Sequence, residues 1–159
     1  MSEYLFFYTK NNINGYLSNF YIAPFIIDNK NYDSVERYMH YQKALLFNDL
    51  ITAEKIYKCS TPYQCKQLGR QVKNFKENIW NLNKEKIVYD GVYNKFKQNI
   101  YLKNKLLSTK SKILVEASPY DRIWGIGYNE TIALENIEKW GSNLLGKILN
   151  NVRKELSSS

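Results

Sequence analysis

The sequence predicts an α+β chain that is mainly helical, with a small β component. Apolar residues recur at helical spacing in several long segments, whereas the apolar runs that suit strands are short. Clusters of Asn, Asp and Gly separate these segments, as is typical of turns. With 159 residues, 44% of them hydrophobic and 24% charged, the chain has the size and composition of one globular domain. We therefore expect a single domain over residues 1–159, ordered from about 5 to 156.

Short strands are expected near the N-terminus and again late in the chain. Leu5–Tyr8 and Pro24–Ile27 are the early candidates, and Asp28–Asn31 has the composition of a turn. Two small strands in this region can form a hairpin beside the main helix. Ile113–Val115 is the late strand, and Pro119–Gly127 follows it as a loop.

The main helix is expected over Asp33–Phe47, beginning at Asp33 or Ser34. At 100° per residue, Glu36, His40 and Lys43 fall along one stripe of this helix, next to its apolar face. This stripe can face either a pocket or the solvent. Glu36 has two interpretations, because it lies three residues after Asp33 and can complete a capping box instead of serving a reaction.

The other helices are predicted from caps and apolar spacing. They are expected over Leu50–Lys58 after Asp49, from Pro62 to Gly69 after Thr61, from an Asn83 cap to about Gln98, around Leu102–Leu107, and over about Asn143–Leu156, with Ser157–Ser159 disordered.

Composition narrows the class of protein. The net charge of +8 and the 14 tyrosines suit a site for an anionic ligand or contact with nucleic acid, although a lysine-rich surface alone has the same composition. No apolar run approaches the roughly 18 residues of a membrane span, and no signal pattern opens the chain. We expect a cytoplasmic protein with no membrane contact. Cys59 and Cys65 lack further cysteine or histidine neighbours, so we expect reduced thiols and no metal site.

The loop after the late strand carries an acid, an indole and two glycines. Asp121 can orient a sugar hydroxyl or act as a base, and Trp124 can stack on a heterocycle next to Gly125. The alternatives are that Asp121 only forms a turn and that Trp124 only fills the core. Trp80 can be a core residue or a surface on which a heterocycle stacks. Arg70 can bind a phosphate or pair with an acidic side chain.

One apparent nucleotide motif is treated as a coincidence. Gly141–Lys147 matches the first seven positions of a P-loop, but Ile148 replaces the Ser or Thr that would reach Mg²⁺. The strand that must precede such a loop is also missing, because Asn136–Trp140 has a helical pattern.

A series of short motifs runs in order along nearly the whole chain, from about Phe6 to Leu156. The motifs are Gly15–Phe20, Pro24-Phe25, Ser34-x-Glu36, Lys43-Ala44-x-x-Phe47, Lys66-x-Leu68-Gly69-Arg70, Trp80, Lys95-Phe96-x-Gln98-Asn99, Glu116–Pro119 with Asp121, Trp124-Gly125-x-Gly127, Gly141-x-Asn143-x-Leu145-Gly146 and Arg153. This ordered set resembles the NADAR family, also called YbiA-like. The sequence departs from the family pattern at Asn150, where a Met is usual, and agrees with it at His40.

The resemblance implies a compact, mainly helical fold and hydrolysis of N-glycosidic bonds. Family members cleave phosphoribosylamino-pyrimidine intermediates of riboflavin biosynthesis, and others remove ADP-ribose from guanine in nucleic acid. We therefore expect a nucleotide-like small molecule or ADP-ribosylated nucleic acid as substrate, with no cofactor and no metal. The residues assigned on this basis are Glu36, Lys43 and Asp121 as catalytic groups, and Asn19, Arg37, His40, Arg70, Trp80, Trp124 and Gly125 as substrate-binding groups.

Two reaction routes fit these residues. Lys43 can hold the sugar as a Schiff base while Glu36 shuttles protons, provided that burial or a neighbour such as Arg37 or Arg70 lowers the pKa of Lys43. Alternatively, Glu36 or Asp121 activates water and Lys43 binds a phosphate. A non-catalytic ADP-ribose or NAD-binding module and a basic nucleic-acid-binding protein are the alternatives to an enzyme.

Overall fold

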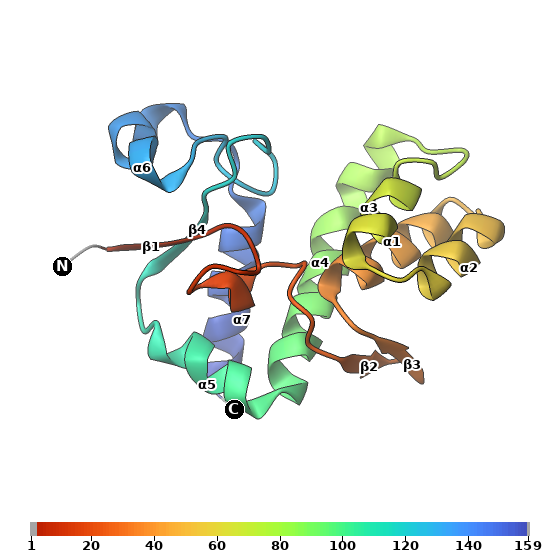
Figure 1. The fold of residues 1–159 in the computed structure, drawn as a ribbon, viewed down its shortest axis with the longest axis horizontal. Helices are drawn as coiled ribbons and strands as arrows, with labels where there is room; N and C mark the ends of the chain where they lie inside the picture. Colours follow the sequence, from red (N-terminus) through yellow and green to blue (C-terminus); the bar gives the residue numbers. More distant parts are fainter. Residues whose placement is uncertain (1–2, 159) are drawn as a thin grey trace. The chain divides into compact units, whose positions relative to one another are not determined.

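The computed structural model describes residues 3–158 and is mainly helical with a few short strands (Figure 1). The expected α+β class is therefore confirmed. The chain forms two compact units: one comprises Ile22–Asn99, and the other combines Met1–Tyr21 with Ile100–Ser159.

The unit Ile22–Asn99 holds a hairpin and four helices. Its elements are β2 (Phe25–Ile27), β3 (Lys30–Tyr32), α1 (Val35–Leu46), α2 (Leu50–Lys58), α3 (Pro62–Gly69) and α4 (Glu77–Gln98). Helix α1 packs against α2, α3 and α4, so three helices surround the segment that carries Glu36, His40 and Lys43.

The hairpin pairs β2 with β3 in antiparallel register, with Phe25 opposite Tyr32. Asp28 and Asn29 join the strands with φ values of 52° and 65°, the left-handed conformation that two-residue hairpin turns favour and that Asn and Asp tolerate. The expected turn over Asp28–Asn31 is thus two residues long. The strand expected at Leu5–Tyr8 is not part of the hairpin.

Helix starts follow the predicted caps with one exception. The side chain of Ser34 accepts from the Arg37 amide and begins α1, while Asp49 and Thr61 cap α2 and α3 as expected. The predicted start of α4 at Asn83 is wrong, because the helix begins at Glu77. Asn83 lies inside the helix, where its side chain donates to the Ile79 carbonyl.

The buried side of α1 meets an aromatic cluster and a close helix contact. The Tyr38 ring lies edge-on to the rings of Tyr32 and Phe25, at centroid distances of 5.0 and 6.0 Å. Gly91 of α4 packs directly on Tyr38, since a β-carbon there would lie 3.0 Å from the tyrosine ring. These contacts bury α1 on two sides and hold its stripe of polar residues in place.

The other unit contains a parallel strand pair and the C-terminal helix. Its elements are β1 (Tyr4–Phe7), η1 (Gly15–Leu17), α5 (Ile100–Ser108), β4 (Ile113–Glu116), α6 (Glu130–Ala133), η2 (Leu134–Lys139) and α7 (Leu144–Ser157). Strands β1 and β4 run in parallel, with Tyr4 opposite Ile113. The early strand therefore pairs with the late one, which the spacing of the chain did not indicate.

In the segment that matches part of a P-loop, five consecutive amides are already bonded to one loop of the same unit. The amides of Gly141, Ser142 and Asn143 donate to carbonyls of the loop 122–126, as do those of the next two residues. Asn143 adopts a left-handed conformation, with φ of 51°, and its side chain bonds the Glu116 amide and the Leu114 carbonyl. This segment joins α7 to β4, which supports its interpretation as a structural element.

The last helix ends one residue later than the expected end at Leu156. Helix α7 includes Ser157, which the sequence analysis assigned to a disordered tail, whereas Ser159 lies outside the described residues. Within residues 3–158, none of the helices combines the length and the apolar character needed to cross a membrane.

Candidate active site

Glu36 is buried in the first turns of α1 and contacts His40. The two residues are only 4% and 6% exposed, and Glu36 Oε2 lies 3.3 Å from His40 Nε2, one turn along the helix. The expected alternative for Glu36, a capping box with Asp33, does not describe this arrangement, because Ser34 caps the helix. Glu36 is therefore a buried acid that does not cap the helix. Burying a carboxylate costs free energy, and helix capping does not account for that cost here.

Lys43 lies two turns after Glu36 on the same stripe, beside two aromatic rings. Its Nζ is 4.8 Å from the centroid of the Phe75 ring and 5.7 Å from that of Trp80. Burial lowers the pKa of Lys43, and the charge of Arg70 lowers it further, whereas the charge of Glu36 opposes both. Burial and one cationic neighbour are the two conditions that favour a neutral, nucleophilic amine.

The aromatic and cationic neighbours of Lys43 come from three different segments. Arg70 follows α3 as its C-terminal cap, Trp80 lies in the first turn of α4, and Phe75 belongs to the connection between these helices. Trp80 was expected just before a helix, so its placement inside α4 is a correction. Phe75 was missed, and no local pattern singles it out, because its role depends on the packing of its ring against Phe47.

His40 is enclosed by α3. Gly69 lies against its imidazole, so a β-carbon at position 69 would overlap Nδ1 and come within 2.7 Å of both adjacent ring carbons. The Nδ1 atom is buried and has no hydrogen-bond partner among residues 3–158. Sequence analysis placed Gly69 only at the end of a helix and did not predict this contact.

Arg37 does not extend toward this stripe. Its guanidinium binds both carboxylate oxygens of Asp33, at 2.8 and 3.1 Å, and its Nη1 donates to the carbonyls of Ile56 and Cys59, at 2.8 and 2.7 Å. Arg37 Nη1 is also 3.2 Å from the Sγ of Cys59, a free thiol whose sulfur lies 2.8 Å from that of Cys65. The donors of Arg37 thus connect α1 to the end of α2, a structural use of a residue predicted to bind substrate.

The remaining predicted residues belong to the other unit. Asp121 Oδ1 accepts from the amides of Ile123 and Trp124, both at 2.9 Å, so Asp121 forms the turn that was one of its two interpretations. Gly125 packs closely on this loop, since a β-carbon there would lie 2.8 Å from the Glu116 carbonyl oxygen. Asn19 is buried, and its Oδ1 has no hydrogen-bond partner among the described residues.

Comparisons with known proteins agree with the motifs and the fold. The model of the NADAR domain matches residues 6–157. This chain belongs to the NADAR family. N-glycosidase R617 of Acanthamoeba polyphaga mimivirus is 48% identical over 126 residues, which cover 78% of this chain and 74% of that protein. Riboflavin biosynthesis protein VVA0006 of Vibrio vulnificus is 30% identical over 98% of this chain, although the match covers only 39% of that protein.

A solved structure extends the agreement to three dimensions. The NMR structure of the Escherichia coli protein YbiA superimposes with a TM-score of 0.82 at 30% sequence identity, covering 99% of this chain and 88% of that one. The family predicted from the motifs is therefore confirmed, as is its fold. Within this NADAR chain, the structure brings Glu36, His40, Lys43, Arg70 and Trp80 into one unit around α1.

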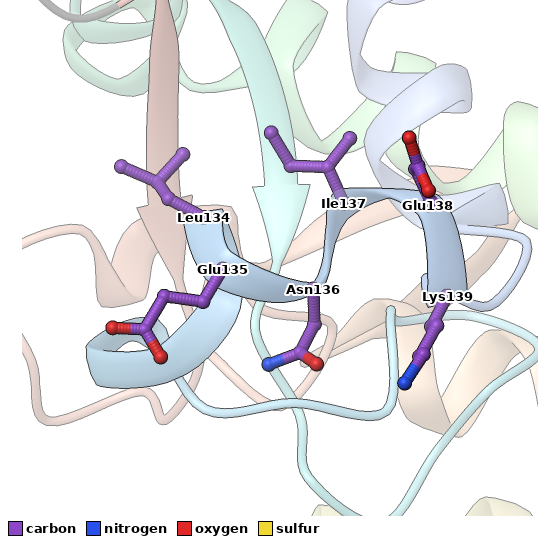
Figure 2. A pocket seen from close by; sticks show the side chains of 6 residues that line it. All are labelled: Leu134, Glu135, Asn136, Ile137, Glu138 and Lys139. Atoms are coloured by element: carbon purple, nitrogen blue, oxygen red, sulfur yellow. The ribbon is translucent and has the colours of Figure 1, made fainter.

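Two other kinds of feature, metal-binding groups and hollows that could hold a ligand, offer less support for a reaction in the described residues than the cluster on α1 does. No group of three His, Cys, Asp or Glu side chains able to hold a metal ion occurs within residues 3–158. A hollow of about 540 Å³ is lined by the six residues of η2. Figure 2 shows that Leu134, Ile137 and Glu138 extend to one side of this turn while Glu135, Asn136 and Lys139 extend to the other, so the polar groups do not converge. A second hollow, of about 530 Å³, lies at the carboxyl ends of β1 and β4 and is lined mainly by aromatic and amide side chains.

Proposed function

We propose that this chain is an N-glycosidase that hydrolyses the bond between ribose C1 and an exocyclic amine of a nucleobase-like heterocycle. The observation that carries the proposal is the cluster on α1: a buried acid, Glu36, and a lysine of lowered pKa, Lys43, beside the Trp80 indole. The printed names of relatives such as N-glycosidase R617 support the reaction class.

The first route uses Lys43 as a nucleophile. A ribosylamine opens to an imine at C1, the neutral Lys43 amine adds to this carbon, and the amine of the heterocycle leaves with a proton. The sugar is then held on Lys43 as a Schiff base, and water adds to C1 to release the sugar aldehyde and the free amine. Glu36 supplies and removes the protons in these steps, which requires its carboxylate to reach the reacting atoms. Trp80 offers an aromatic surface for the heterocycle.

The lowered pKa of Lys43 favours this route. An ammonium group has no lone pair, so a lysine reacts only in its neutral form, and burial together with Arg70 increases that fraction. In the alternative route Glu36 activates water directly and Lys43 remains charged to bind a phosphate. A role that needs a charged Lys43 gains nothing from burial or from a nearby Arg70.

Two substrate classes are proposed for the same reaction. The name of the Vibrio vulnificus relative supports a phosphoribosylamino-pyrimidine intermediate of riboflavin biosynthesis. The net charge of +8 favours the more anionic alternative, ADP-ribose on guanine in nucleic acid. Assays of the purified protein on both substrates, at two salt concentrations, separate them, because binding to nucleic acid weakens steeply with salt.

The assignments in the other unit remain predictions from the family resemblance. Asp121 is proposed as a second catalytic carboxylate, and Asn19, Trp124 and Gly125 as substrate-binding residues. Asp121 has one carboxylate oxygen bound to two amides. A cytoplasmic location is likewise proposed.

Borohydride trapping tests the reaction and the route together. The protein is incubated with the phosphoribosylamino-pyrimidine, or with ADP-ribosylated oligonucleotide, and borohydride reduces any imine to a stable amine. We expect a sugar adduct on the peptide that contains Lys43, none in Lys43→Ala, and an unchanged yield in Lys58→Ala, an exposed lysine of the same unit. Turnover without an adduct, retained in Lys43→Ala, would establish the direct-water route. Binding of ADP-ribose without turnover of either substrate would identify a binding module instead.

A further inference from the structure

We infer that His40 is a positioning residue for Glu36 and that Gly69 of α3 holds it in that role. The inference rests on the proposed function of Glu36 as the proton-transferring group. It replaces the predicted contact between His40 and substrate.

The hydrogen-bonding capacity of His40 supports this role. A neutral imidazole has one N–H donor and one bare nitrogen, and a buried donor without an acceptor is costly. Nε2 faces the Glu36 carboxylate at 3.3 Å, whereas Nδ1 has no polar partner among the described residues. The arrangement that leaves no buried donor unsatisfied puts the proton on Nε2, from which it is donated to Glu36 Oε2.

Both ring nitrogens are then unavailable to a substrate. Nε2 is bound to Glu36, and the buried Nδ1 is covered where the ring packs on Gly69. His40 is 6% exposed, so the ring has little surface from which to contact a ligand. The imidazole instead holds Oε2 of the carboxylate, and this contact orients the Glu36 side chain.

Gly69 determines where the imidazole lies. Because a β-carbon at position 69 would overlap Nδ1, any other residue there would push the ring along α1 or tilt it away from Glu36. Gly69→Ala therefore displaces the imidazole without removing its hydrogen-bonding groups.

The experiment compares His40→Leu, His40→Gln and Glu36→Gln by steady-state kinetics on the phosphoribosylamino-pyrimidine or the ADP-ribosylated oligonucleotide, whichever the protein turns over. Leucine removes the donor but keeps apolar volume, and glutamine places an amide N–H near the position of Nε2. We expect His40→Leu to lower kcat by about 10- to 100-fold with KM changed less than about twofold, as for a misplaced catalytic group. His40→Gln is expected to recover kcat to within about threefold of the wild type, because the donor is restored.

A double-mutant cycle with Gly69→Ala tests the contact itself. We expect Gly69→Ala to lower kcat in the wild type and to have no further effect on kcat in His40→Ala, where no ring remains to be displaced. Thermal unfolding of each variant reports the folded fraction, so that kcat refers to folded protein.

The outcomes distinguish this inference from the proposed function. If the wild type turns over neither substrate, the proposed function is wrong. If Glu36→Gln retains activity, Glu36 is not the proton-transferring group, and the premise of this inference is wrong although the reaction class stands. If Glu36→Gln is inactive while His40→Leu retains full kcat, only the positioning role is overturned. Equal losses in His40→Leu and His40→Gln would also overturn it, as would a rise in KM alone, which would indicate contact with substrate.

Discussion

Replacing Arg37 with methionine tests the structural role that the fold gives this residue. The Arg37 side chain is 7% exposed and that of its partner Asp33 is 33% exposed, so the pair is only partly solvated. Breaking a buried ion pair by removing one member costs about 3–5 kcal/mol, and the exposure of Asp33 favours the lower end. The change also leaves the carbonyls of Ile56 and Cys59 without their donor. We therefore expect Arg37→Met to lose about 3 kcal/mol of unfolding free energy.

Thermal unfolding followed by circular dichroism measures this loss. For a chain of this length, about 3 kcal/mol corresponds to a fall in Tm of roughly 6–12 °C. Lys86→Met is the matched control, because the Lys86–Asp90 pair has side chains 79% and 36% exposed and is worth less than about 1 kcal/mol. At a temperature where both variants are folded, KM for the substrate should equal that of the wild type. An unchanged Tm together with a raised KM would refute the structural role and return Arg37 to substrate binding.

Asp33 provides a pH test of the same pair. Burial raises the pKa of Asp33, but the hydrogen bonds and charge of Arg37 outweigh burial and hold it below the usual 3.8. A carboxyl with a lowered pKa in the folded state contributes stability above its unfolded pKa and loses it as the pH falls through the folded value. We expect the wild type to lose this contribution below about pH 4. In urea unfolding, the difference in unfolding free energy between pH 7 and pH 3 should therefore be smaller for Asp33→Asn than for the wild type.

Three further predictions concern other groups. Burial lowers the pKa of Lys95 from 10.5 to about 7, so between these pH values the unfolded chain binds more protons than the folded one and the free energy of unfolding should rise with pH. Urea unfolding at pH 6 and pH 9 should show this rise in the wild type and not in Lys95→Met. Arg70→Gln should raise the pKa of Lys43 and move the rising limb of the pH profile of kcat/KM to higher pH. If the limb does not move, it does not report the titration of Lys43. Asp121→Asn keeps an oxygen that can accept from both amides, so a loss of kcat at unchanged Tm would reveal a chemical role, and full activity would leave only the turn.

Local chemistry along the chain was enough to predict most helices of the Ile22–Asn99 unit. Asp49 and Thr61 are short polar side chains that each accept from the amide three residues ahead, so their effect on the backbone depends on neighbours in sequence. The spacing of Glu36 and His40 likewise places them one turn apart on any helix, and the structure finds them in contact. The predicted start of α4 at Asn83 was wrong because an asparagine side chain can bond the backbone in two ways. It can cap a helix or, as Asn83 does, donate to a carbonyl inside one.

By itself, then, the sequence determined the family, the helical class and the polar stripe of α1, because these depend on residue order and periodicity. Only the tertiary structure decided which strands pair, that Arg37 binds Asp33 and the end of α2, and that Phe75 and Gly69 reach Lys43 and His40. A guanidinium can bind either a phosphate or a carboxylate, so its partner depends on which group the fold places beside it. The local sequence around a glycine likewise does not indicate which side chain will pack against it.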